Sequence, residues 1–134
     1  MDRKLDQANE TFTKAIKIDP KYADAYNRRG AVYSDAMKLD LAIADFTKAI
    51  ELNPKLEIPY LNRGTIYLMY KKDYKSALEN FNKMLELSPD NWMGFMFRAM
   101  AYEKMGEKAL ADADNKKVKE LMDKEKQKIN PNQK

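Results

Sequence analysis

Hydrophobic and polar residues alternate along this chain with the spacing of α-helices. Tyr26, Gly30 and Tyr33 are four and three positions apart, so they lie on one helix face, and the apolar set over residues 42–49 has the same spacing. Large and small residues alternate on both faces, which allows two antiparallel helices to approach closely. The pattern therefore predicts closely packed helix pairs.

The pattern recurs with a period of 34 or 35 residues, and Pro20, Pro54 and Pro89 mark the periods. An aromatic–small–aromatic set with an arginine inside it occurs three times, as Tyr26, Arg29, Gly30 and Tyr33, as Tyr60, Arg63, Gly64 and Tyr67, and as Phe95, Arg98, Ala99 and Tyr102. A second set occurs as Ala8, Phe12 and Ala15, as Ala42, Phe46 and Ala49, and as Ala77, Phe81 and Met84. We place the one extra residue of the second period in a turn over 71–73.

The repeat predicts an all-α chain of about seven helices. The residue before each proline is pushed out of the helical region, so second helices should end at Asp19, Asn53 and Ser88. Asp40 and Asp73 suit the start of second helices, because a carboxylate there accepts hydrogen bonds from free backbone N–H groups. The expected helices cover residues 3–18, 23–36, 40–52, 57–70, 74–87, 91–105 and 107–127, with a frayed end over 129–134.

This pattern resembles the tetratricopeptide repeat family, through the set that runs from Tyr26 to Pro54 and its near-copy from Tyr60 to Pro89. The resemblance implies an α-solenoid, a right-handed superhelix of antiparallel helix pairs. It divides the chain into a partial repeat with only a second helix (1–20), two repeats (23–56 and 57–91), a degenerate repeat with a long terminal helix (92–127) and a basic frayed tail (128–134). The absence of a first helix before residues 1–20 leads us to expect a longer array of which this chain is part.

The third copy departs from the pattern in two places. Ala99 replaces the glycine, and Asn115 stands where the phenylalanine of the second helix would be. In that terminal helix, Val118, Leu121 and Met122 share one side with lysines around them. We expect the helix to cap the stack.

Composition excludes most enzyme chemistry. The 134 residues are 44% hydrophobic and 34% charged, which suits one folded domain, and they include no cysteine and no histidine. Thiolate and imidazole metal sites, a cysteine nucleophile and the commonest general base are therefore absent. No glycine-rich phosphate loop is present, and no histidine is available to activate a serine. We expect a non-enzymatic protein without catalytic residues, metal or cofactor.

The net positive charge is confined to one end of the chain. The net charge is +4, and residues 116–134 hold seven lysines against three acidic residues, whereas residues 1–115 are neutral. A neutral body predicts no nucleic-acid partner and argues against the related pentatricopeptide repeats, which read RNA. Residues 1–10 are charged throughout, and no apolar stretch is long enough for a bilayer, so we expect a cytoplasmic protein without a membrane partner.

The resemblance implies a concave groove lined by the first helices, where relatives bind extended or helical peptides. On these helices one stripe is left after the packing faces are assigned. Its residues are Asp24, Asn27, Arg28, Ala31, Ser34 and Asp35 in the first pair, Ile58, Leu61, Asn62, Thr65, Leu68 and Met69 in the second, and Met93, Met96, Phe97, Met100, Glu103 and Lys104 in the third. The stripe changes from polar to methionine-rich, which suits varied apolar partners.

We therefore predict a protein–protein interaction module that binds a peptide or amphipathic helix with apolar anchors. The candidate peptide-binding residues are Asn27, Arg28, Ile58, Leu61, Asn62, Thr65, Met69, Met93, Met96, Phe97 and Met100. Asn62 matches the position where relatives hold a ligand backbone. The lysines and arginines with which some relatives clamp acidic C-termini are replaced by Met93 and Phe97, which argues against such a clamp.

Three alternatives stay open at this stage. The terminal helix could cover the methionine-rich stripe and make it part of the core. The face of residues 5–18 that carries Leu5, Phe12 and Ile16 lacks a partner helix, so the chain could self-associate or stack through its ends. The chain could also be a non-catalytic part of a larger protein.

Overall fold

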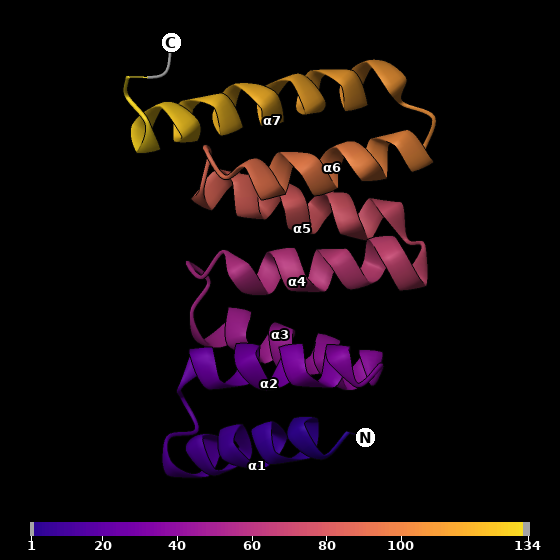
Figure 1. Cartoon of the computed structure of the whole chain (residues 1–134). Helices are drawn as coiled ribbons and strands as arrows, with labels where there is room; N and C mark the ends of the chain where they lie inside the picture. Colours follow the sequence, from indigo (N-terminus) through magenta and orange to yellow (C-terminus); the bar gives the residue numbers. More distant parts are fainter. Residues whose placement is uncertain (1, 133–134) are drawn as a thin grey trace.

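The computed structural model describes residues 2–132, and over this range the chain consists of helices joined by short turns, without a strand. The helices are α1 (Arg3–Ile18), α2 (Ala23–Asp35), α3 (Leu39–Leu52), α4 (Ile58–Ile66), the π-helical turn η1 (Tyr67–Lys71), α5 (Tyr74–Leu87), α6 (Trp92–Lys104) and α7 (Lys108–Ile129). They stack in chain order, with α1 at one end and α7 at the other (Figure 1). The all-α solenoid expected from the repeat is confirmed.

We call α2, α4 and α6 the first helices and α1, α3, α5 and α7 the second helices. Each first helix packs between the second helix before it and the second helix after it, and contacts reach little beyond these neighbours. The molecule is therefore held together by local interfaces repeated along one direction.

The alternation of large and small residues explains how close the pairs lie. A Cβ atom added at Gly30 would come within 2.7 Å of the Phe46 ring, and one added at Gly64 within 2.7 Å of the Phe81 ring. Both phenylalanines are fully buried. The predicted close approach of paired helices is thus confirmed, and at Gly30 and Gly64 it requires glycine because a larger side chain leaves no room for the ring.

Helix starts follow the expected capping at Asp73 but not at Asp40. The Asp73 carboxylate accepts hydrogen bonds from the Ser76 hydroxyl at 2.7 Å and from the Ser76 N–H at 3.1 Å, and these bonds lower the pKa of Asp73. The prediction for Asp40 was wrong, because α3 begins one residue earlier, at Leu39, and Asp40 lies inside its first turn. There the Asp40 carboxylate accepts a 2.8 Å hydrogen bond from Lys71 Nζ instead.

The extra residue of the second repeat is absorbed differently from the prediction. We placed it in a turn over 71–73, but the chain widens into the π-helical turn η1 from Tyr67, and the Asp73 N–H donates to the Tyr67 carbonyl at 3.0 Å. Such single-turn bulges accommodate one added residue within a helix. The bulge leaves Met69 and Tyr70 half-exposed.

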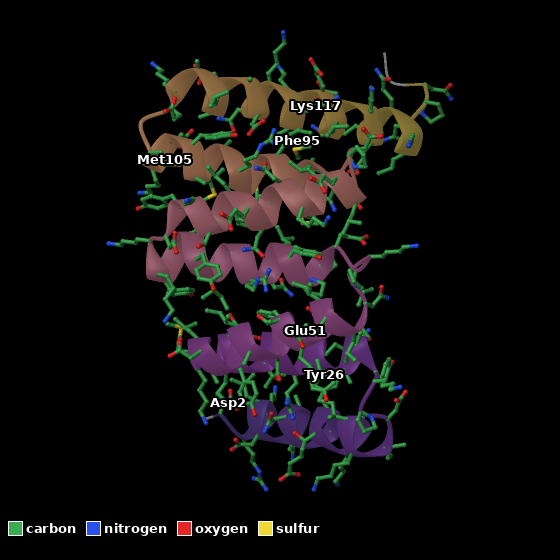
Figure 2. The ribbon with its side chains drawn as sticks, turned by 180° about the vertical axis from the view of Figure 1, so that it is seen from behind. Asp2, Tyr26, Glu51, Phe95, Met105 and Lys117 are labelled. Carbon is green, nitrogen blue, oxygen red and sulfur yellow. The ribbon has the colours of Figure 1, made fainter. Side chains whose placement is uncertain are left out.

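The last helix packs without the missing phenylalanine. Asn115 is exposed, and α7 is fixed to α6 by the buried Ala111 and Leu121 and by Asp114, whose carboxylate accepts two hydrogen bonds from Arg98. Figure 2 shows Phe95 in the layer between these two helices. Helix α7 continues to Ile129, two residues past the predicted end, while Gln133 and Lys134 of the expected frayed tail lie outside the described residues.

Candidate functional site

The three first helices share one hollow of about 350 Å³. It is lined by Ala31, Ser34 and Asp35 from α2, Leu61, Asn62, Thr65 and Ile66 from α4, Met69 and Tyr70 from η1, Phe97 from α6 and the Phe46 ring from α3. This volume is at the lower end of the range for ligand cavities, about 300–1,000 Å³. The hollow lies along the stripe that the sequence assigns to the groove.

Two predicted polar residues contact each other across the first helices. The Asn62 Nδ2 group donates to Asn27 Oδ1 at 3.2 Å, which leaves the Asn62 side-chain oxygen available to a ligand. The Thr65 hydroxyl donates to the Leu61 carbonyl at 2.7 Å and so presents acceptor lone pairs outward. The side chains of Asn62 and Thr65 are therefore held in place by neighbouring helix atoms.

Arg28 is engaged within its own helix and does not line the hollow. Its guanidinium donates to Asp24 at 2.7 Å, and this bond raises the pKa of Arg28. The pair is exposed to solvent, one turn apart on α2. Ile58, another predicted site residue, is also exposed but lies at the start of α4, outside the lining of the hollow.

The apolar part of the hollow is a floor with an exposed edge. Leu61 is buried and belongs to the core cluster around Phe81, whereas Met69 is 51% exposed. Phe97 is half-buried and stacks on Phe81, with 5.9 Å between ring centroids. A ligand in the hollow would therefore contact the Met69 side chain directly, and it would reach the Phe97 ring only from the side that is not buried.

The methionine-rich stripe of α6 is divided. Met93, Phe97 and Met100 pack on the central core cluster, whereas Met96 is half-buried without being part of that packing. Met93 lines a second hollow, at the turn between α5 and α6, together with Trp92 and Glu125 of α7. Of the four predicted anchors, only Phe97 lines the hollow shared by the first helices.

The last helix does not close this hollow. Helix α7 packs on the side of α6 that carries Arg98, and none of its residues lines the hollow that contains Phe97. Along the stripe of α6, α7 contributes Glu125 beside Met93 at one end and Asn115 at the other, where Asn115 Nδ2 donates to Glu103 Oε1 at 3.4 Å. Helix α7 therefore reaches only the two ends of the α6 stripe, near Met93 and Glu103, and does not cover the part at Phe97.

Ser34, Asp35 and Tyr70 line the hollow but were absent from the predicted site residues. Ser34 and Asp35 were on the groove stripe, so helical spacing had identified their face. Tyr70 is not on the groove stripe, and the one-residue change in period is the only sequence signal that its side chain would line the hollow. It is half-exposed at the mouth of the hollow.

The repeated arginines lie between helices, where their role is packing. Arg29 donates two 2.8 Å hydrogen bonds to the buried Asp45 of α3, and a weaker one of 3.4 Å to Thr13 of α1. The bond to Asp45 raises the pKa of Arg29. Arg98 repeats the arrangement with Asp114 and Asn82, while Arg63 meets a neutral Asn80 at the carboxylate position.

Two other kinds of site are absent from residues 2–132. No group of three or more acidic side chains in residues 2–132 is placed to hold a metal ion. None of the described helices combines the length and apolar character needed to cross a bilayer.

Solved structures of MamA have the same fold. Three of them superpose with TM-scores of 0.85, 0.81 and 0.77, each at 24% identity over 92% of this chain and over 71%, 67% and 70% of theirs; the third is MamA MSR-1 C2. No curated protein sequence matches the chain.

Sequence models of one protein family match the chain over most of the helical stack. The matches are to a TPR repeat at residues 4–35 and to the tetratricopeptide repeat at 23–56 and 59–91. Tandem helix pairs of this kind form interaction scaffolds with extended concave surfaces. The chain belongs to the tetratricopeptide repeat family and is, in general terms, a scaffold for protein–protein interaction.

Proposed function

We propose that this protein binds a peptide segment of a partner, extended or helical, in the groove along α2, α4 and α6. The observation that carries the proposal is the hollow to which all three first helices contribute, with an apolar floor and polar groups at its rim. Such a surface fits a segment with one or two apolar anchors and hydrogen-bonding groups between them.

Each part of the hollow has a separate task in this proposal. Met69 and Phe97 accept the apolar anchor, and burial of an anchor there gains about 25 cal/mol for each Å² of apolar surface removed from water. The side-chain oxygen of Asn62 accepts a hydrogen bond from the ligand backbone. Because Asn27 already fixes the Asn62 amide, little conformational entropy is lost on binding.

A charge placed in the hollow tests the proposal. In about 1 M salt, where attraction between charges is screened, we expect Met69→Asp to weaken binding at least about ten-fold, since a carboxylate would lose hydration against the apolar floor. Peptides selected from a displayed random library on the unmodified protein serve as ligands, and their dissociation constants are measured by fluorescence anisotropy. Met69 is 51% exposed, so helicity and thermal unfolding should change little.

Two matched variants make the result specific. Met105→Asp puts the same charge at a similarly exposed methionine that follows α6 and does not line the hollow (Figure 2), and should bind as the unmodified protein does. Met96→Asp should have an effect between the two, because Met96 is on the groove stripe but outside the hollow. Selected peptides that bind Met69→Asp with unchanged affinity would contradict the proposal.

A second candidate function, self-assembly, is favoured by the surface of α1. Ala42, Phe46 and Ala49 are buried beneath α2, whereas their equivalents Ala8, Phe12 and Ala15 are only half-buried, because no described helix covers that face. No residue of α1 is fully buried. A second copy of the chain could cover this apolar face.

Sedimentation over a dilution series distinguishes self-assembly from peptide binding. Self-assembly predicts a mass that rises with protein concentration, and Phe12→Glu should remove the rise because it puts a charge in the contact. Leu110→Glu, at a half-exposed leucine of α7, is the control and should associate as before. A monomer at every concentration would eliminate this candidate and leave peptide binding untouched.

A further inference from the structure

Three residues at the rim of the hollow, Asp35, Asn62 and Thr65, present hydrogen-bond acceptors. The Asn62 amide donates one of its two N–H groups to Asn27, and the Thr65 hydroxyl proton is engaged by the Leu61 carbonyl, so the side-chain oxygens of both residues offer lone pairs. Asp35 adds a carboxylate, which accepts only. A ligand group rich in donors therefore matches this rim better than a carboxylate or phosphate does.

The charge of the hollow is also one-sided. Asp35 is its only charged lining residue, and no lysine or arginine lines it. Within residues 2–132 the Asp35 side chain makes none of the ion pairs or side-chain hydrogen bonds that hold the other polar groups, and it is exposed. By contrast, Asp24 of the same helix is neutralised by Arg28, and Asp40 by Lys71.

The position of Asp35 strengthens this negative potential. Asp35 is the last residue of α2, and Met69 and Tyr70 lie in the last turn of the α4–η1 helix, so the C-terminal ends of two parallel first helices meet at the hollow. Helix C-termini carry a partial negative charge, which attracts cations and makes a carboxylate there unfavourable for the helix itself. Asp35 therefore does not stabilise α2.

We infer that the hollow receives a basic side chain, arginine or lysine, of the partner peptide. The inference rests on the proposed groove function and adds the chemistry of its ligand. The cationic head pairs with Asp35 and the Thr65 oxygen, and its aliphatic stem is the apolar anchor that lies across Met69 and the Phe97 ring, while the Asn62 oxygen accepts from the ligand backbone. Long basic side chains combine an apolar stem with a charged end in this way.

The same charge distribution disfavours acidic ligands. A carboxylate in the hollow would meet Asp35 without a compensating cation, and like charges brought together at an interface reduce affinity and select against wrong partners. Peptides selected on the groove should therefore be enriched in arginine and lysine next to an apolar residue.

Small cations test the hollow without a known partner. The probes are n-butylguanidinium, its neutral isostere n-butylurea, and pentanoate, each titrated into the full chain in low salt while ¹H–¹⁵N spectra are recorded. We expect saturable shifts of the amides near Asp35 and Met69 with n-butylguanidinium, in about the millimolar range for so small a ligand. Affinity should be at least about three-fold lower for n-butylurea and lowest for pentanoate.

Asp35→Asn isolates the charge. It removes a carboxylate from a helix C-terminus, so the fold should be retained, and the preference for n-butylguanidinium over n-butylurea should disappear. Asp123→Asn, at an exposed aspartate of α7, is the matched control and should keep the preference. The preference of the unmodified protein should also shrink in high salt.

The outcomes separate this inference from the proposed function. Equal binding of n-butylguanidinium and n-butylurea, or a preference that survives Asp35→Asn, would overturn the inference while the peptide selection and Met69→Asp decide the groove independently. Absence of shifts near the hollow with all three probes would overturn it as well. Loss of selected peptides in Met69→Asp, with no basic residue in those peptides, would keep the groove and refute its ligand chemistry.

Discussion

At the scale of single residues, the turn between a first and a second helix shows how one conformation serves three different side chains. Met37, Lys72 and Gly106 occupy equivalent positions, and all three have positive φ angles, 60°, 53° and 79°. Only glycine adopts this left-handed region without steric cost. The first two repeats therefore hold a strained residue where the third holds glycine.

Replacement of Met37 by glycine should stabilise the protein. The relief of left-handed strain exceeds the entropy that glycine adds to the unfolded chain, and Met37 is 56% exposed, so little packing is lost. We expect a gain of about 0.5–1 kcal/mol in the free energy of unfolding, measured with urea. Gly106→Ala is the reverse experiment and should lose about 1 kcal/mol through strain alone, since no atom lies within 4 Å of the added Cβ. A less stable Met37→Gly variant would disprove this account.

At the scale of helices, the repeated arginines link neighbouring elements. Each lies on a first helix and bonds to the second helix on either side, and ring faces at 5.4–5.9 Å flank the guanidinium groups. Sequence alone showed that Arg29, Arg63 and Arg98 repeat. The link itself depends on Asp45 and Asp114, which are distant in sequence and buried against them.

Loss of one arginine should leave a buried charge without a partner. Arg29→Met is expected to destabilise the protein by about 3 kcal/mol, because the Asp45 carboxylate would stay in the interface uncompensated. The double variant Arg29→Met with Asp45→Leu should recover most of that loss, since well-packed apolar residues replace such pairs at little cost. Urea unfolding of the three proteins measures both steps, and a double variant no more stable than the single one would contradict the explanation.

At the scale of the whole molecule, stability should be greatest in the middle of the stack. The largest fully buried side chains include Phe46, Ile66, Phe81 and Met84, all on α3, α4 and α5. By contrast, α1 has no buried residue, and the last turns of α7 are exposed after Leu121. A solenoid with neighbour-only contacts opens from its ends.

Hydrogen exchange should follow this gradient. We expect amides of α1 and of residues 122–129 to exchange at least about ten-fold faster than those of α4 and α5, because they open locally without unfolding the centre. Exchange measured by mass spectrometry on peptic fragments reports each helix. Uniform protection from α1 to α7 would instead indicate that the stack unfolds as a single unit.

The sequence by itself determined the helix pairs, their closing prolines and the faces that pack. These features depend on spacing within one helix, where 3.6 residues per turn fix which side chains share a face. The ring of Phe46 against Gly30 could be predicted because both sets recur in register. The groove stripe, including Asp35, follows from the same rule once the family resemblance assigns that face.

Only the tertiary structure decided which stripe residues come together. The meeting of Asp35, Asn62 and Phe97 in one hollow depends on how far each first helix is shifted and rotated against the last, and on the bulge at η1 that exposes Met69 and Tyr70. The separation of Met93 from Phe97 has the same origin. Periodicity places a side chain on its own helix, whereas the distance between side chains of different helices is set by the packing of every residue between them.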